Sequence, residues 1–147
     1  MIQLGVKKSS IDVARNGLEA VKAVQSTGAS CDAGGRPFYS VILMDIQMPL
    51  MDGYEATSLI RKYEKEQGAR LKGLSAKGCL QVRPSPVPIY ACTANAFAED
   101  DQACHNAGCT RVLHKPMKKA EVKSILEKHV FQEPAPPTIT QIASDHR

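Results

Sequence analysis

Short apolar runs, separated by longer stretches of mixed polarity, divide the chain into candidate strands and candidate helices. Four of these runs are short enough to be strands, which usually span about four to eight residues. They predict strands at residues 10–14, 39–44, 87–92 and 109–114. The run at 39–44 is apolar with little interruption, a pattern typical of a strand that is buried on both of its faces.

A helix is predicted after each candidate strand. Asn16 is placed to cap the first helix, and Gly108 lies just past the end of the third, which has three acidic residues in its first turn. The predicted helices begin after Asn16 and cover residues 54–66, 97–106 and 119–130, and the last has Val122, Ile125 and Leu126 facing inward. Strands that alternate with helices predict an α/β domain, in which helices cover both faces of a parallel sheet.

Three segments have neither strand nor helix periodicity. Residues 26–37 are rich in Gly, Ser and Ala, and residues 67–88 contain several Gly and Pro residues and lean basic. The second segment is longer than the ~12–15 residues usual for a connection, so we interpret it as an inserted loop that is tolerated rather than catalytic. Residues 131–147 contain three prolines and predict a disordered tail, which leaves one domain at residues 1–130.

Composition and charge indicate which partners and which cellular compartment to expect. The net charge of +4 comes without a basic run or an aromatic-interleaved patch, so no nucleic-acid partner is expected. No apolar run approaches the ~20 residues of a spanning helix, so this segment is expected to make no membrane contact. The chain is therefore expected in the cytoplasm, or on the cytosolic side of a larger membrane-bound protein. The five cysteines are scattered and are expected to stay reduced.

Three polar residues directly follow apolar strand runs: Asp45, Thr93 and Lys115. In an open parallel sheet the functional crevice lies at the carboxyl ends of the strands, so these side chains should converge. Taken singly, each has an ordinary structural explanation: Asp in a turn, Thr at a strand end, Lys in solvent. Together they predict a phosphoryl acceptor, in which Asp45 attacks phosphorus, Thr93 hydrogen-bonds a product oxygen and Lys115 neutralises another.

Four segments in the expected order resemble the motifs of response-regulator receiver domains, and in particular those of hybrid histidine kinases. They are residues 44–56 around the acceptor, 16–20, 92–96 and 113–116. The resemblance implies a flavodoxin-like, doubly wound parallel sheet with strand order 2-1-3-4-5. It also implies that a kinase histidine phosphorylates Asp45, that Thr93 and Lys115 are catalytic and bind the phosphoryl group, and that a histidine-phosphotransfer protein is the next acceptor.

The same resemblance implies a magnesium ion held by Asp45 and the backbone carbonyl of Gln47, and a cis peptide between Lys115 and Pro116. Receivers begin with a strand that carries adjacent acidic residues, and no such strand precedes Met1. We therefore expect a truncated receiver whose first strand and acidic pair are missing, with weaker magnesium binding and impaired phosphorylation. Val112 stands where many receivers have an aromatic residue.

Two other functions remain open. One is a receiver-like docking module that binds a kinase or a phosphotransfer protein without being phosphorylated. The other is an aspartyl-phosphate hydrolase, which uses a second carboxylate where this chain has Gln47. As an enzyme, a receiver would at most catalyse its own phosphorylation and dephosphorylation.

Overall fold

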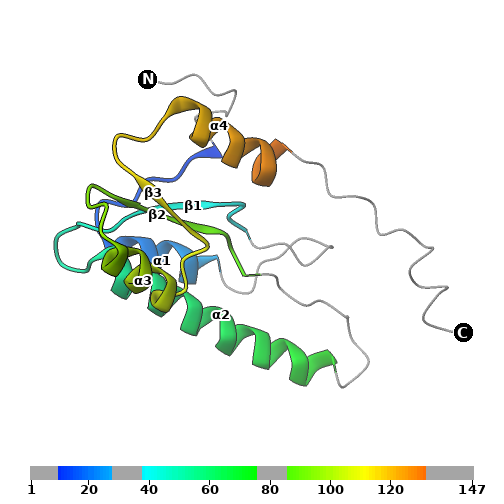
Figure 1. Cartoon of the computed structure of the whole chain (residues 1–147). Helices are drawn as coiled ribbons and strands as arrows, with labels where there is room; N and C mark the ends of the chain where they lie inside the picture. The colour runs from blue at the N-terminus through cyan, green and yellow to red at the C-terminus, as the bar shows by residue number, and fades with distance from the viewer. Residues whose placement is uncertain (1–9, 28–37, 76–85, 132–147) are drawn as a thin grey trace, which may run out of the picture.

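The computed structural model describes residues 10–27, 38–75 and 86–131, together with the side chains of all of these except residues 71–75. The chain alternates strictly between helices and strands up to its last two elements, as Figure 1 shows. The elements are α1 (Gly17–Ser26), β1 (Ile42–Asp45), α2 (Gly53–Ser75), β2 (Ile89–Thr93), α3 (Ala98–Ala107), β3 (Arg111–His114), α4 (Lys119–Leu126) and the π-helical turn η2 (Glu127–Phe131).

The three strands form a parallel sheet in the order β1-β2-β3. Helices α1, α2 and α3 lie on one side of it and α4 on the other, which confirms the predicted α/β architecture (Figure 1). The observed order agrees with the last three positions of the expected 2-1-3-4-5 arrangement. The first strand of that arrangement is the one predicted to be missing, and the second corresponds to the segment at residues 10–14.

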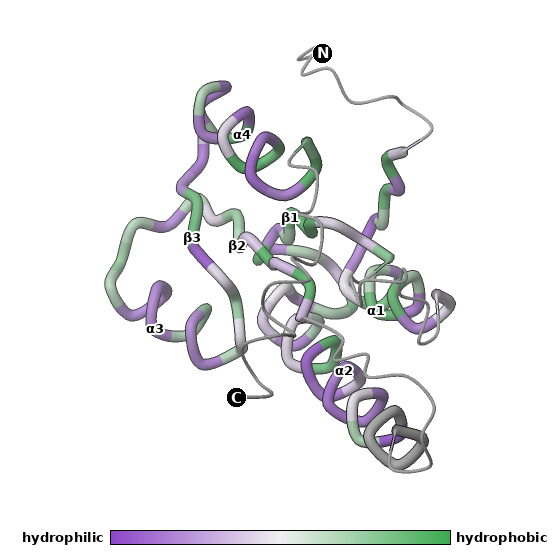
Figure 2. Tube along the Cα trace, turned by 90° about the vertical axis from the view of Figure 1, so that its right-hand side faces the viewer, coloured by the Kyte–Doolittle hydropathy of each residue, from purple (hydrophilic) through white to green (hydrophobic). Residues whose placement is uncertain are grey.

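The core consists of two apolar layers that meet at β2, whose five residues are all buried. Ile89 and Ala91 face α1 and α2 and pack in the larger layer with Ile60. Tyr90 and Cys92 face the opposite way and pack with Leu113 and with Ile125 of α4. This alternation follows from the pleat of a strand, which points successive side chains to opposite faces. Most of α3 is coloured as hydrophilic in Figure 2, in keeping with its single buried residue, Cys104.

The predicted strand at residues 10–14 is wrong. These residues pair with none of the strands that the structure describes, and the side chains of Ile11 and Val13 are 53% and 84% exposed. An alternating apolar pattern makes a strand only when a neighbouring strand supplies hydrogen bonds. The helix that follows begins as predicted, because the Asn16 side chain accepts a hydrogen bond from the Glu19 backbone N–H at 2.9 Å.

The strand that leads to Asp45 is shorter and less buried than predicted. It starts at Ile42 rather than residue 39, and Leu43 is 42% exposed whereas Met44 is buried. β1 is an outer strand of the described sheet, and one face of an outer strand can remain open to solvent. The expectation that this strand is buried on both faces is therefore wrong at Leu43.

The second helix is longer than predicted. It continues to Ser75, so the first nine residues of the loop expected at 67–88 are helical. The segment lacks an apolar stripe and contains two glycines, but its other residues include Gln, Ala, Arg, Lys and two Leu, which have high helix propensity. Residues 86–88 lead into β2, and residues 76–85 lie outside the described part of the chain.

The ends of the last two helices are close to the predictions. Gly108 ends α3 with a φ of 101°, the left-handed conformation that glycine adopts without strain. The predicted helix at 119–130 is α4 followed by η2, with Ile125 buried and Val122 and Leu126 partly buried. The predicted tail lies outside the described residues after Phe131. Among the helices that the structure describes, none is both long and apolar enough to cross a membrane.

Candidate functional site

Asp45 is the last residue of β1, and both oxygens of its carboxylate are engaged. Oδ1 accepts a hydrogen bond from the Gln47 backbone N–H at 3.1 Å, and Oδ2 lies 2.8 Å from the Lys115 ammonium. The side chain is 41% exposed, so this carboxylate is fixed in orientation but remains accessible to a reactant.

Lys115 directly follows β3 and joins its strand to the end of β2. Its backbone N–H donates to the carbonyl oxygen of Thr93 at 2.8 Å, and its side chain reaches across β2 to Asp45. The peptide between Lys115 and Pro116 is cis, which confirms that expectation. The predicted convergence of the three strand ends therefore takes the form of one ion pair and one backbone hydrogen bond.

Thr93 ends β2 and is 2% exposed, the deepest of the three predicted site residues. Its hydroxyl oxygen accepts a hydrogen bond from the Asn95 backbone N–H at 3.1 Å. Because that contact uses the oxygen as an acceptor, the hydroxyl proton is left to donate to a group in the crevice.

A turn after β1 forms the wall of the crevice next to Asp45. It is held by hydrogen bonds from the Gly53 N–H to the Ile46 carbonyl at 3.0 Å and from the Gly17 N–H to the Met51 carbonyl at 3.1 Å. A Cβ at Gly53 would lie 2.5 Å from the Asp45 carbonyl oxygen, so α2 can start this close to the strand end only with glycine there.

Two exposed apolar side chains lie in the loops that follow β1 and β2. Leu50 has a φ of 67° and is 85% exposed, and the Met51 N–H donates to the Pro49 carbonyl across it at 2.8 Å. Leucine adopts this left-handed conformation only at a cost, so the fold holds the side chain outward against a local strain. Phe97, before α3, is 68% exposed.

Of the two residues predicted to hold magnesium, Asp45 has its carboxylate at this site, and Gln47 contacts that carboxylate through its backbone N–H. In the described part of the chain no group of three His, Cys, Asp or Glu side chains is placed to hold a metal. Magnesium usually keeps several waters and binds through one or two carboxylates together with phosphate oxygens. The Asp45 carboxylate meets the lower limit of that donor set, and the role of the Gln47 carbonyl stays a prediction.

Three residues at this edge were not singled out from the sequence: Cys92, Asn95 and His114. Burial raises the pKa of the Cys92 thiol, while Lys115 lowers it and Asp45 raises it. The Cys92 side chain is therefore a buried, protonated thiol near the ion pair of Asp45 and Lys115. His114 precedes Lys115, and its Nδ1 lies 3.1 Å from the Asn95 carbonyl oxygen. Neighbouring strand-end positions could have drawn attention to His114, but its ring contact could not be read from sequence.

Known proteins are similar to this chain in sequence and in structure. No protein-family model matches it. Over 120 residues and 81% of the chain it is 39% identical to "Hybrid signal transduction histidine kinase B" of Dictyostelium discoideum. The chain spans only 5% of that protein, and 5% to 14% of three histidine kinases that it matches.

Two solved structures are similar over most of their length. The first is the receiver domain of a sensor histidine kinase from Pseudomonas aeruginosa PAO1 with magnesium in its active-site cleft, at 30% identity and a TM-score of 0.58, covering 88% of this chain and 80% of that one. The second is a Saccharomyces cerevisiae complex of the histidine phosphotransfer protein Ypd1 with the receiver domain of its downstream response regulator Ssk1, at 30% identity and a TM-score of 0.62, covering 86% and 75%.

Proposed function

Because the chain belongs to the response-regulator receiver family of two-component phosphorelays, we propose that Asp45 is its phosphoacceptor. The donor would be the phosphorylated histidine of a histidine kinase, and the next acceptor a histidine-phosphotransfer protein. The solved relatives include a receiver bound to such a phosphotransfer protein, which supports this choice of partner. The parent protein would be a hybrid histidine kinase, the class to which a relative belongs.

The observation that carries the proposal is the ion pair of 2.8 Å between Lys115 and Asp45 at the carboxyl edge of the sheet. Its position is that of the functional crevice in open α/β folds. A carboxylate that is partly exposed and next to an ammonium is suited to attack an anionic phosphoryl group, because the cation offsets the repulsion between the two negative charges.

In the proposed step, an Asp45 carboxylate oxygen forms a bond to phosphorus while the bond from phosphorus to the donor histidine nitrogen breaks. The electron pair of that bond stays on the leaving imidazole. Lys115 then exchanges its contact with the free carboxylate for one with a phosphoryl oxygen, and the Thr93 hydroxyl donates to another. The product is an aspartyl phosphate, whose phosphoryl group carries about −1.5 to −2 charge in place of the single negative charge of the free carboxylate.

Magnesium, when bound, supplies positive charge to the phosphoryl oxygens during transfer. Asp45 and the Gln47 carbonyl are the described groups that would hold it. The receiver from Pseudomonas aeruginosa with magnesium in its cleft supports this part of the proposal.

The decisive experiment is phosphorylation of the 147-residue chain by a small phosphodonor with magnesium, followed by intact-mass measurement. The expected result is a gain of one phosphoryl group that is lost in Asp45→Asn. Asp52→Asn, an exposed carboxylate seven positions later, is the matched control and should still be labelled. A folded chain that gains no phosphoryl group, or an Asp45→Asn variant that still does, would contradict the proposal.

The docking module is the second candidate. The observation in its favour is that, among the described residues, no three His, Cys, Asp or Glu side chains are placed to hold a metal ion. It predicts that the folded chain binds a phosphotransfer protein with the same affinity with and without Asp45→Asn, and that neither form is labelled.

A further inference from the structure

Three hydrogen bonds hold the turn that follows Thr93. The Asn95 N–H donates to the Thr93 hydroxyl oxygen at 3.1 Å, and the Lys115 N–H donates to the Thr93 carbonyl at 2.8 Å. The third joins Nδ1 of His114 to the Asn95 carbonyl oxygen at 3.1 Å. Two of the three therefore come from the end of β3, and only the His114 contact is made by a side chain outside the turn.

The direction of the His114 hydrogen bond follows from chemistry. A carbonyl oxygen only accepts, so Nδ1 must carry the proton. That proton is present in one neutral tautomer and in the imidazolium, so the contact does not depend on the charge of the ring. The other nitrogen, Nε2, faces the Asp101 carboxylate at 3.8 Å.

We infer that His114 is a positioning residue for phosphoryl transfer, acting through Asn95 on the Thr93 hydroxyl. His114 fixes the carbonyl side of Asn95, and the N–H side of Asn95 fixes the oxygen of the Thr93 hydroxyl. With the acceptor role of that oxygen occupied, the O–H is directed away from the turn. This inference rests on the proposed function, because an oriented hydroxyl matters only where a phosphoryl group is received.

The contact with the Asp101 carboxylate does not explain the role of His114. Its two side chains are 45% and 51% exposed, and exposed pairs at such distances contribute little. Asp101→Asn should therefore leave the phosphorylation rate within about twofold of the unchanged chain.

Asparagine and leucine at position 114 make a matched test. In asparagine the side-chain amide nitrogen takes the place of histidine Nδ1. Leucine has nearly the same shape as asparagine but carries no donor. With a small phosphodonor and magnesium, His114→Leu should be phosphorylated about three- to tenfold more slowly, the effect of one lost hydrogen bond. His114→Asn should recover to within about twofold of the unchanged chain. Equal rates for all three, or a His114→Asn rate as slow as that of His114→Leu, would overturn the inference.

A second measurement needs no phosphoryl transfer. Amide hydrogen exchange at Asn95, whose N–H is bonded to Thr93, should be faster in His114→Leu and unchanged in His114→Asn. If the unchanged chain is never labelled, the proposed function fails, and the positioning role of His114 fails with it. If the unchanged chain is labelled but His114→Leu changes neither the amide exchange at Asn95 nor the phosphorylation rate, only the role of His114 is wrong.

Discussion

The Lys115 ammonium lies 2.8 Å from the Asp45 carboxylate although 70 positions separate the two residues in sequence. The sheet creates this contact, because parallel strands place their carboxyl ends at the same edge. The lysine side chain passes the end of β2, which lies between the two strands. The acceptor thus has a counter-ion before any phosphoryl group arrives.

Removing that counter-ion should slow chemistry without unfolding the chain. We expect Lys115→Ala to reduce the phosphorylation rate by roughly ten- to hundredfold, because a positioned cation at a developing negative charge is lost. The free energy of unfolding should change by less than about 1 kcal/mol, since both side chains are about 40% exposed. Rates with a small phosphodonor and urea titrations measure the two effects. Lys119→Ala, at another exposed lysine, should change neither; a rate for Lys115→Ala equal to that control would count against the role of Lys115.

The residues at the strand ends were predictable because their signal is local. Asp45, Thr93 and Lys115 each follow a predicted strand. Parallel strands place these ends at the same edge of the sheet. Residues 10–14 show the limit of such patterns: whether an alternating segment pairs depends on a neighbour, which its own sequence does not contain. The extension of α2 to Ser75 was missed for a related reason. Residues of favourable propensity can form a helix without a repeating apolar stripe, so the pattern that predicts an amphipathic helix was absent there.

The contact between His114 and Asn95 could not be predicted for a different reason. It depends on the rotamer of one ring and on the path of a turn, and neither is encoded as a repeat or a motif. The exposure of Leu43 was also outside the reach of the sequence, because an apolar run does not say which of its neighbours will cover it.

Leu50 and Phe97 lie in the loops that follow β1 and β2 at the carboxyl edge of the sheet, and we expect them to contact a protein phosphodonor. Exposed apolar anchors of this kind often dominate an interface, at 1 kcal/mol or more each on truncation to alanine. The double change Leu50→Ala and Phe97→Ala should slow transfer from a phosphotransfer protein by roughly tenfold and leave labelling by a small phosphodonor unchanged. Phe131→Ala removes a phenylalanine that is 47% exposed at the far end of η2 and should affect neither reaction. Equal loss with both donors would point to damage at Asp45 instead of lost contact.

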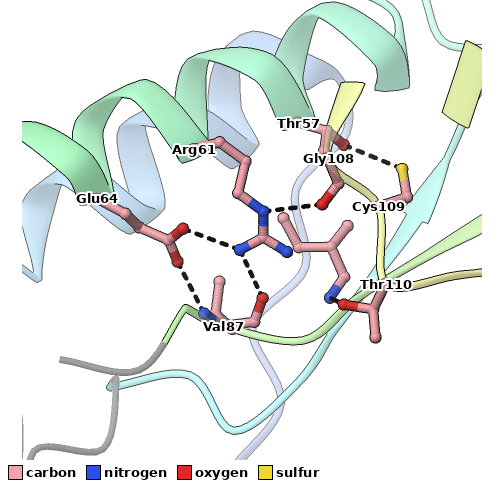
Figure 3. A network of polar contacts seen from close by, with 8 residues as sticks. Thr57, Arg61, Glu64, Val87, Gly108, Cys109 and Thr110 are labelled. Atoms are coloured by element: carbon pink, nitrogen blue, oxygen red, sulfur yellow. Dashed lines mark hydrogen bonds and ion pairs between the residues drawn. The ribbon is translucent and has the colours of Figure 1, made fainter. Parts of the chain in front are cut away.

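Arg61 ties α2 to the segments that precede β2 and β3, as Figure 3 shows. Its guanidinium donates to the carbonyls of Gly108 at 2.9 Å and Val87 at 2.7 Å, and to the Glu64 carboxylate at 2.8 Å. Glu64 in turn accepts from the Val87 N–H at 2.8 Å. One side chain therefore holds the approach to β2 and the approach to β3 against the same helix.

Arg61→Leu should cost about 2–3 kcal/mol of unfolding free energy, because it leaves partly buried carbonyls without a donor. The phosphoryl-transfer rate of the molecules that remain folded should not change, since the network lies away from the crevice. Urea titration followed by circular dichroism measures the first effect, and labelling at low urea the second. Lys62→Leu, one position along on the exposed side of α2, should stay within about 0.5 kcal/mol. Equal stabilities of the two variants would show that the Arg61 contacts are not formed in solution.

The buried thiol of Cys104 should make the chain less stable in alkali. Burial raises the pKa of Cys104 from 9.0 to about 11, with a smaller contribution from Cys109 in the same direction. The folded chain therefore keeps a proton at pH values where the unfolded chain has lost it. This contribution to stability is complete below pH 9.0 and is lost as the pH rises through about 11.

Burial also raises the pKa of Tyr54, from 10.0 to about 12, so the two groups titrate in overlapping ranges. Urea titrations between pH 8 and about pH 10.5 should show a falling free energy of unfolding. The fall should be shallower in Cys104→Ala, even though that variant starts from a lower stability because it leaves a cavity. Comparing slopes instead of absolute values separates the two effects. Parallel slopes for the two proteins would mean that Cys104 ionises as easily in the folded chain as in the unfolded one, and that its burial between α2 and α3 is not maintained in solution.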